Sequence, residues 1–406
     1  MISGIKKDAC CGCSACVSIC PQKCISMVED KEGFLYPQIG TTLCVGCSLC
    51  RKVCPNLMEP TEPDCLPIGY GAYAKETKIH AECSSGGVSY LLAEQIVSRG
   101  GIVYGCAMDF SCQTAMHIRA DSIEALQQFK GSKYIQSDLN DTFKLIENDL
   151  NNNKLVLFFG VPCQINGLRS FLCKDFKNLL CCEVICHGVS SPLVWKAYMQ
   201  YLEKKYHSSI TAVSFRSKGK NQRVTVKIIN DNKQTIFIPK QKNLFMKLYL
   251  QNYSVRPSCY NCDAKKTKSL ADITLGDLWG VEFIKPELNN KLGTSCVFIN
   301  TDKGKQLFTS VCNKLFVKEI SSQKAIKANP SYYESVKMPE DRADFFRDIK
   351  VMSFPELTKH YYKAPPLKLK QWVLSELYSL YNLFSKKRKT TLKYGMLVEM
   401  SHKRKQ

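Results

Sequence analysis

The stretch "CCGCSACVSICP", residues 10–21, decides how the first part of the chain folds, because five of its twelve residues are cysteine. Its cysteines include a C-x2-C-x2-C-x3-C run that ends before Pro21. Residues 44–55, "CVGCSLCRKVCP", repeat this spacing 34 positions later and end on Pro55. Three thiolates on one tight loop can bind three corners of an iron–sulfur cubane, and the fourth ligand then comes from elsewhere in the fold.

The two runs resemble the bacterial two-cluster ferredoxin, in which the fourth cysteine of each run binds the cluster of the other run. The resemblance implies two [4Fe-4S] clusters, one held by Cys10, Cys13, Cys16 and Cys54 and the other by Cys44, Cys47, Cys50 and Cys20. Structural zinc is the alternative, but zinc sites usually pair C-x2-C knuckles across longer loops. Cys11 and Cys24 do not fit the spacing and are interpreted as spare thiols.

The use of cysteine indicates metal ligands rather than disulfides. Of 23 cysteines in 406 residues, eleven fall within the first 65, and "MISGIKKDAC" offers no apolar leader before them. No apolar run approaches the roughly 18 residues typical of a spanning helix. We therefore expect a cytoplasmic protein.

The formal net charge is +21. Three clusters of charge about −2 each would lower it to roughly +15. This basic balance suits an acidic electron carrier, whereas no helix-turn-helix, RNP or zinc-finger pattern supports nucleic acid as a partner.

The rest of the chain predicts an α/β core. Residues 25–39 read as strand, turn and strand, as the ferredoxin fold needs. Helix is expected over 88–99 and through most of 122–153, around a "GSKY" turn, and strands over 101–109, 155–160 and 179–184. Three antiparallel strands are expected over 210–240, and "ADITLGDLWG", 271–280, is expected to be a strand and turn.

Four further cysteines lie at expected loop positions. Cys163 follows a strand in "GVPCQINGL", Cys186 follows another in "ICHGVSSP", and "RPSCYNC" carries Cys259 and Cys262. A lone cysteine is usually a small buried hydrophobe, but four together are enough for one more cubane.

Several motifs together resemble the coenzyme F-420 hydrogenase/dehydrogenase beta-subunit family. They are "SSGGVSYLL", "GSKYIQS", "FFGVPCQINGLR", "VICHGVSSP", "FRSK", "RPSCYNC" and "ADITLGDLWG", spread over about residues 70–300. The resemblance implies an α/β domain that binds FAD and a third [4Fe-4S] cluster held by Cys163, Cys186, Cys259 and Cys262. The remaining cysteines of this region are interpreted as packing thiols: Cys83, Cys106, Cys112, Cys173, Cys181, Cys182, Cys296 and Cys312.

The expected flavin site combines two loops. A Gly-Gly turn at a helix start exposes N–H groups that suit a pyrophosphate, and "GSKY" adds N–H groups, a hydroxyl, a cation and an aromatic ring. The candidate residues are Ser85, Gly86, Gly87, Gly131, Ser132, Lys133 and Tyr134. A plain helix cap at the first loop and a solvated surface lysine at the second are the alternatives. His187 is a candidate proton donor, with a structural hydrogen bond as its alternative role.

These assignments predict an α+β ferredoxin-like domain over 1–60, a linker over 61–69 and an α/β flavin and iron–sulfur domain over 70–325 that includes an antiparallel strand region. A basic, mainly helical extension follows over 326–406, and we expect the first two domains to have independent cores. The predicted function is an oxidoreductase that moves electrons between a ferredoxin-type donor and a small substrate, deazaflavin or nicotinamide. The alternative is a non-catalytic electron-transfer subunit that docks on a catalytic partner.

The C-terminal stretch 367–389, "LKLKQWVLSELYSLYNLFSKKRK", predicts an amphipathic helix with a basic end. Such a helix can lie on an anionic membrane surface. We favour the simpler interpretation, a helix packed on the catalytic domain.

Overall fold

A computed structural model describes residues 4–58, 66–218, 224–265 and 269–364. The ferredoxin-like part begins with helix α1 (Ala15–Ile19), continues through strands β1 (Ile25–Glu29) and β2 (Leu35–Ile39), and ends with helix α2 (Leu49–Lys52). β1 and β2 pair antiparallel, with Ile25 opposite Ile39, which confirms the strand–turn–strand prediction. Gly33 in the turn adopts φ +84 and passes so close to Leu193 that a side chain there would clash.

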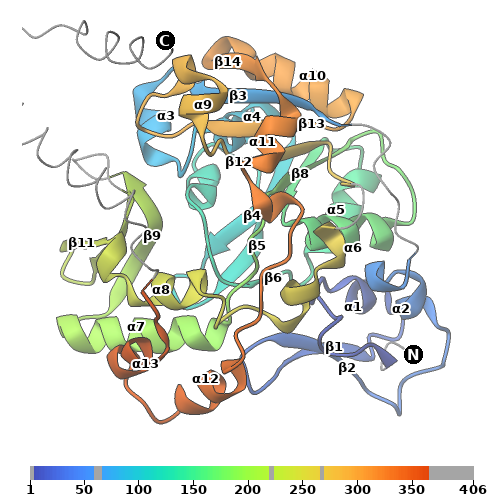
Figure 1. Ribbon diagram of the computed structural model, residues 1–406. Coiled ribbons are helices and arrows are strands. Elements are labelled where there is room, and N and C mark those ends of the chain that lie inside the picture. Colours follow the sequence, from blue (N-terminus) through green and yellow to red (C-terminus); the bar gives the residue numbers. More distant parts are fainter. Residues whose placement is uncertain (1–3, 59–65, 219–223, 266–268, 365–406) are drawn as a thin grey trace, which may run out of the picture. The chain divides into compact units, whose positions relative to one another are not determined.

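A nine-stranded mixed sheet forms the centre of the described chain (Figure 1). Its strand order is β14-β3-β13-β12-β8-β7-β4-β5-β6. Four neighbouring strands, β12, β8, β7 and β4, run parallel, and the remaining pairs are antiparallel except β5 with β6. The strands are β3 (Ile68–Ala74), β4 (Ile102–Met108), β5 (Ala115–Ala120), β6 (Ser137–Asp138), β7 (Val156–Gly160), β8 (Leu179–Val184), β12 (Ile273–Asp277), β13 (Ser295–Ile299) and β14 (Leu315–Ile320).

Helices cover both faces of this sheet. In β7, successive apolar side chains point to opposite faces, and each face packs against helices. Leu157 packs with α4 (Val88–Val97) and α10 (Asp302–Val311) on one face. Val156 and Phe158 pack with α5 (Thr142–Asn151) and α6 (Pro162–Leu172) on the other. Successive side chains of a strand point to opposite faces, so a strand apolar on both faces needs two helix layers. Shorter helices at the sheet margin are α3 (Thr77–Glu82), α9 (Val281–Ile284) and α11 (Ser322–Lys327).

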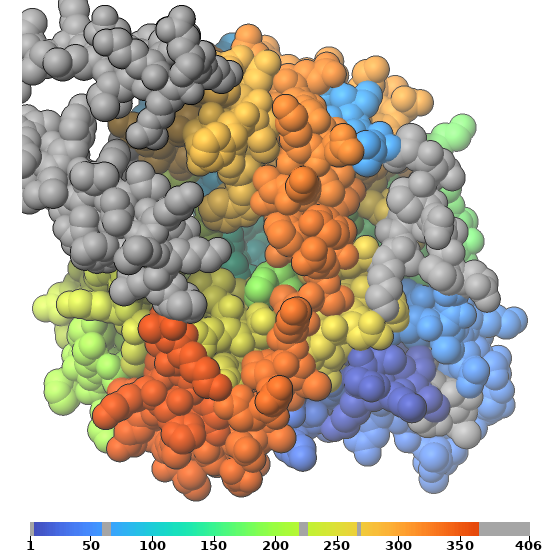
Figure 2. Space-filling view, viewed as in Figure 1, coloured from blue at the N-terminus to red at the C-terminus, as the bar shows by residue number. Residues whose placement is uncertain are grey.

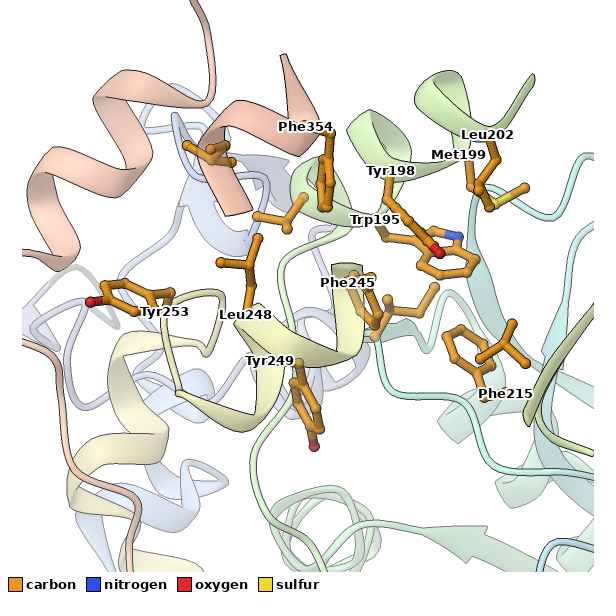
Figure 3. Close-up of a cluster of buried hydrophobic side chains, with 14 of the residues drawn as sticks. Trp195, Tyr198, Met199, Leu202, Phe215, Phe245, Leu248, Tyr249, Tyr253 and Phe354 are labelled. Atoms are coloured by element: carbon orange, nitrogen blue, oxygen red, sulfur yellow. The ribbon is translucent and has the colours of Figure 1, made fainter. Parts of the chain in front are cut away.

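A second sheet and its helices form a separate aromatic core (Figures 1 and 3). The strands are β9 (Ile210–Lys218), β10 (Val224–Asn230) and β11 (Thr235–Pro239), paired antiparallel as predicted. Trp195 stands at its centre, with ring centroids 4.7 Å from Phe215 and 4.9 Å from Phe245. The helices around it are α7 (Pro192–Tyr206), α8 (Leu244–Leu250), α12 (Arg342–Asp348) and α13 (Phe354–Tyr361).

The structure corrects two expectations. The core of the ferredoxin part is not independent. A small cluster around Cys16, Cys20, Cys24 and Ile25 lies within it, but Phe34 and Tyr36 belong to the Trp195 core and Cys13 packs with Phe143 and Phe158. The prediction of helix through most of 122–153 was too long, since only α5 is α-helical there, and residues 125–129 form a 3-10 turn. Residues 326–361 lie in one compact unit with everything before them, and the proposed domain boundaries stay a prediction.

The predicted C-terminal helix, 367–389, and its membrane contact lie outside the described residues. Within those residues, no helix is both long enough and apolar enough to cross a membrane.

Candidate iron–sulfur centres

The two cysteine runs share one backbone conformation, as an internal repeat requires. Gly12 and Gly46 both have φ +71, and Ser14 and Ser48 have φ 61 and 60. These left-handed residues alternate with the thiols and curl each loop, and a short helix follows each of them. The repeat seen in the sequence is therefore also a repeat of structure.

The second run surrounds a small cavity together with Cys20 from the first run. Cys24 also lines this cavity, and its Sγ lies 3.4 Å from the Sγ of Cys20. The run's own thiols in the wall are Cys44, Cys47 and Cys50. The fourth cysteine of one run thus lies with the first three of the other, as the ferredoxin resemblance implies.

Cys54 lies correspondingly with the first run. Burial, together with the nearby Cys10 and Cys54, raises the pKa of the Cys16 thiol to about 12. Burial likewise raises the pKa of Cys54 to about 11, and Cys10 adds to the effect. These thiols lie close enough to repel one another as thiolates, an arrangement that bound iron would stabilise.

A larger cavity brings together Cys163, Cys186, Cys259 and Cys262, which come from three segments far apart in the sequence. Burial raises the pKa of Cys186 to about 12 and that of Cys259 to about 11, and neighbouring thiols contribute to both shifts. All four candidate ligands of the third cluster therefore face one space. Sequence reasoning grouped them correctly, although their role as ligands stays a prediction.

The parallel strands position two of these thiols. β7 and β8 are parallel neighbours, so their carboxyl ends meet at one edge of the sheet. Cys163 follows β7 at the first turn of α6, where Pro162 suits the helix start, and Cys186 follows β8. Gly188 lets the third segment approach, because a Cβ there would lie 2.7 Å from Val255 and 3.3 Å from Cys259.

The backbone ties this third segment to the strand ends. The Arg256 N–H donates to the carbonyl of Val189 at 3.0 Å, and the Cys259 N–H donates to the carbonyl of Arg256 at 2.9 Å. The Cys262 N–H donates to Ser335 Oγ at 2.9 Å. The turn that carries both cysteines is thus held from two sides.

Cys11, interpreted from sequence as a spare thiol, lines the same cavity. Neighbouring Cys13 and Cys163 lower the pKa of the Cys11 thiol. Gly167 of α6 permits this proximity, since a Cβ there would lie 2.7 Å from the Cβ of Cys13. In Figure 2 the blue N-terminal segment lies against the yellow segment around residue 260. The first and third groups of cysteines are therefore neighbours.

Over the described ranges, no three His, Cys, Asp or Glu side chains converge tightly enough for a single metal ion. A cubane binds its four thiolates at separate corners, so it needs a wider cage of sulfurs than one zinc ion does. Cavities walled by several thiols match that requirement.

The structure brings the two expected flavin loops together. The Ser132 N–H donates to Ser84 Oγ at 2.8 Å, and the Ser85 hydroxyl is buried without a hydrogen-bond partner. Two expected phosphate donors are already engaged, however. The Gly86 N–H donates to Ser295 Oγ at 2.9 Å, and Lys133 Nζ donates to the carbonyls of Gln128 and Lys130.

Gly86 also has a packing role, because a Cβ there would lie 2.2 Å from the carbonyl oxygen of Ala72. Gly87 caps α4 with φ +83. Gly131 has φ +87, and a Cβ there would lie 4.0 Å from the hydroxyls of Ser84 and Ser214. Tyr134 packs edge-on against Phe215. The loops therefore fit a phosphate group only in part, because two of the expected donors are already engaged.

His187 lines the third-cluster cavity rather than the flavin loops. Its Nε2 pairs with Asn252 Oδ1 at 2.8 Å, and burial lowers its pKa. The structure thus gives His187 a structural hydrogen bond, and its catalytic role stays a prediction. Sequence reasoning missed Arg256, a buried cation next to Cys10, because its ten-residue neighbourhood carries no charge pattern that would single it out.

The fold and the thiol-lined cavities define an iron–sulfur protein of the electron-transfer class. Residues 9–57 match the family model of the 4Fe-4S dicluster domain, and residues 153–323 match that of the C terminus of the coenzyme F420 hydrogenase/dehydrogenase beta subunit. The chain is thus similar to the coenzyme F420 hydrogenase/dehydrogenase beta-subunit family over residues 153–323 and to the dicluster domain over residues 9–57.

A chain of the F420-reducing [NiFe] hydrogenase complex from Methanosarcina barkeri, solved in a xenon derivatization study, is similar to this protein. The identity is 16%, the match covers 67% of this chain and 93% of that chain, and the TM-score is 0.44. A resemblance this weak supports no argument about function. No curated protein matches the chain.

Proposed function

We propose that this protein is an iron–sulfur flavoprotein oxidoreductase that passes electrons between a ferredoxin-type donor and a small substrate, deazaflavin or nicotinamide. One observation carries the proposal. Four thiols from three distant segments, Cys163, Cys186, Cys259 and Cys262, line one cavity whose wall also includes Cys11 of the first ferredoxin run. Such a cavity suits a third [4Fe-4S] cluster next to the first.

The cysteine groups support a chain of three one-electron carriers. Cys20, Cys44, Cys47 and Cys50 would hold the second cluster, and Cys10, Cys13, Cys16 and Cys54 the first. Cys16 and Cys50 pack in one cluster, and Cys11 and Cys163 line one cavity. These neighbours support the order second cluster, first cluster, third cluster.

FAD is the proposed two-electron group, on the family resemblance, and would bind at the loops that Ser84 and Ser132 join. A flavin pairs single electrons into a hydride, which is the chemistry that a one-electron chain lacks. The unpartnered Ser85 hydroxyl is the buried donor available for it in this structure. Lys133 would have to release two carbonyl groups before it could reach a phosphate.

The proposed donor is an acidic carrier such as a ferredoxin, because the chain has a formal net charge of +21. A non-catalytic electron-transfer subunit is the second candidate, and the family's description as a beta subunit favours it. Turnover of a small substrate by the isolated protein separates them, since a subunit that only relays electrons needs its partner.

Metal analysis tests the proposed cluster content. We expect about 12 iron and 12 acid-labile sulfide per chain after anaerobic reconstitution. Cys259→Ser should retain about eight of each, while the control Cys181→Ser should retain all, because Cys181 is buried against the sheet away from the cavities. Eight iron in the unmodified protein would remove the third cluster, and zinc without sulfide would refute the whole proposal.

A further inference from the structure

Arg256 carries a fully buried guanidinium group where the ferredoxin part meets the rest of the protein. Its Nε donates to the carbonyl of Cys10 at 2.9 Å, Nη1 to Gln136 Oε1 at 2.8 Å and Nη2 to the carbonyl of Leu35 at 2.9 Å. The same Nη2 lies 4.0 Å from Cys10 Sγ. The guanidinium thus contacts the loop of the first cluster directly.

None of these contacts neutralises the positive charge. All three oxygen acceptors are uncharged, and the ring of Tyr36 stacks 4.2 Å from the guanidinium carbon. Over the described residues, no carboxylate forms an ion pair with Arg256, whereas the other deeply buried arginine, Arg342, pairs with Glu32. Burying an unpaired charge is costly, so an anion is expected beside it.

The backbone of the cluster loop is shaped to admit this cation. Gly12 adopts φ +71, and a Cβ there would lie 2.7 Å from Gln136 Nε2 and 3.0 Å from Arg256 Nη1. The cavity of the second run has no corresponding charge, since the residues that line it beside its cysteines are uncharged: Gln22, Ile25, Ile39, Val45, Gly46, Ser48 and Leu49. The two repeated loops thus differ in one respect: a buried cation contacts the first loop, and no charged residue lines the cavity of the second.

We propose that Arg256 is a positioning residue that supplies the countercharge of the first [4Fe-4S] cluster and raises its reduction potential above that of the second. The inference rests on the proposed function, which places a cluster on Cys10, Cys13, Cys16 and Cys54. Reduction adds one negative charge to a cluster, and a nearby buried cation stabilises the reduced form. With the clusters bound, a higher potential at the first cluster would favour electron transfer to it from the second, on the side of the third-cluster cavity.

Two substitutions test the charge in different ways. Arg256→Gln removes it, and Gln136→Glu leaves the arginine in place but neutralises it with a carboxylate of almost the same shape. Arg256→Lys keeps the charge and is the conservative variant. Arg342→Lys is the control, because that arginine is also buried but is already paired with a carboxylate.

Redox titration followed by electron paramagnetic resonance of the reconstituted full chain provides the measurement. The first cluster is the signal that Cys16→Ser removes. In Arg256→Gln and Gln136→Glu, the equilibrium constant for electron transfer from the second to the first cluster should fall about tenfold or more, which is about 59 mV for one electron. Arg256→Lys should retain most of the difference, and Arg342→Lys all of it.

Iron and sulfide content separates two kinds of failure. Full clusters with an unchanged first-cluster potential in both Arg256→Gln and Gln136→Glu would overturn the inference and leave the proposed function intact. Absence of cubanes from the unmodified protein would refute the proposed function itself. If Arg256→Gln fails to assemble clusters, Gln136→Glu alone decides, because it retains every side chain that contacts the loop except one amide.

Discussion

Glu32 and Arg342 form a nearly buried ion pair that holds the ferredoxin hairpin on the rest of the protein. Glu32 lies in the turn between β1 and β2, and its two carboxylate oxygens accept hydrogen bonds from Arg342 Nη1 at 3.0 Å and Nη2 at 2.6 Å. The side chains are 14% and 8% exposed. We predict that Glu32→Gln weakens this attachment strongly.

The size of the effect follows from the contacts that remain. Removal of one partner from a buried pair typically costs about 3–5 kcal/mol. Arg342 keeps hydrogen bonds to the Tyr260 hydroxyl at 2.8 Å and the Val255 carbonyl at 2.9 Å, so the lower end applies. About 3 kcal/mol corresponds to a roughly hundredfold increase in local opening of the hairpin.

Hydrogen exchange of the β1 and β2 amides measures this opening directly and does not require reversible unfolding of an iron–sulfur protein. Lys7→Ala is the control, because Lys7 also pairs with a residue of this hairpin. Lys7 pairs with Asp30 at 3.0 Å but is 62% exposed, so its loss should cost at most about 1 kcal/mol. Similar exchange rates in Glu32→Gln and Lys7→Ala would refute the assignment of Glu32 and Arg342 as the anchor.

Two further predictions concern the larger domain. Lys133→Ala should weaken FAD retention about tenfold or more if the Lys133 cation turns to the cofactor phosphates. Lys130→Ala is the control and should not weaken it, because Lys130 already pairs with Glu82. Equal FAD affinity in the two variants would mean that Lys133 only holds the loop. Burial lowers the pKa of His117 to about 4. As the pH falls below about 6.5, His117 is therefore protonated in the unfolded chain before it is protonated in the folded one. The free energy of unfolding should drop by up to about 3 kcal/mol towards pH 4 as a result. Melting temperatures between pH 4 and 7 should show a shallower decline for His117→Asn, and parallel curves would contradict this account.

The sequence by itself determined the local chemistry of this protein. The repeated cysteine spacing predicted two matched loops, and the alternation of strands and helices predicted an α/β core, because both depend on neighbours within a few residues. It also grouped Cys163, Cys186, Cys259 and Cys262, since each follows a strand end or lies in a turn, where side chains can converge.

Only the tertiary structure decided how these parts meet. The expected independent ferredoxin core proved wrong because Phe34 and Tyr36 pack around residues more than 150 positions away in the sequence. Likewise, Cys11 lines one cavity with Cys163, and Arg256 hydrogen-bonds to Cys10, and no local pattern in the sequence encodes either neighbour. The physical reason is that apolar side chains and a charged group are buried by segments distant in the sequence. The spacing of residues along the chain does not show which distant segments will pack against them.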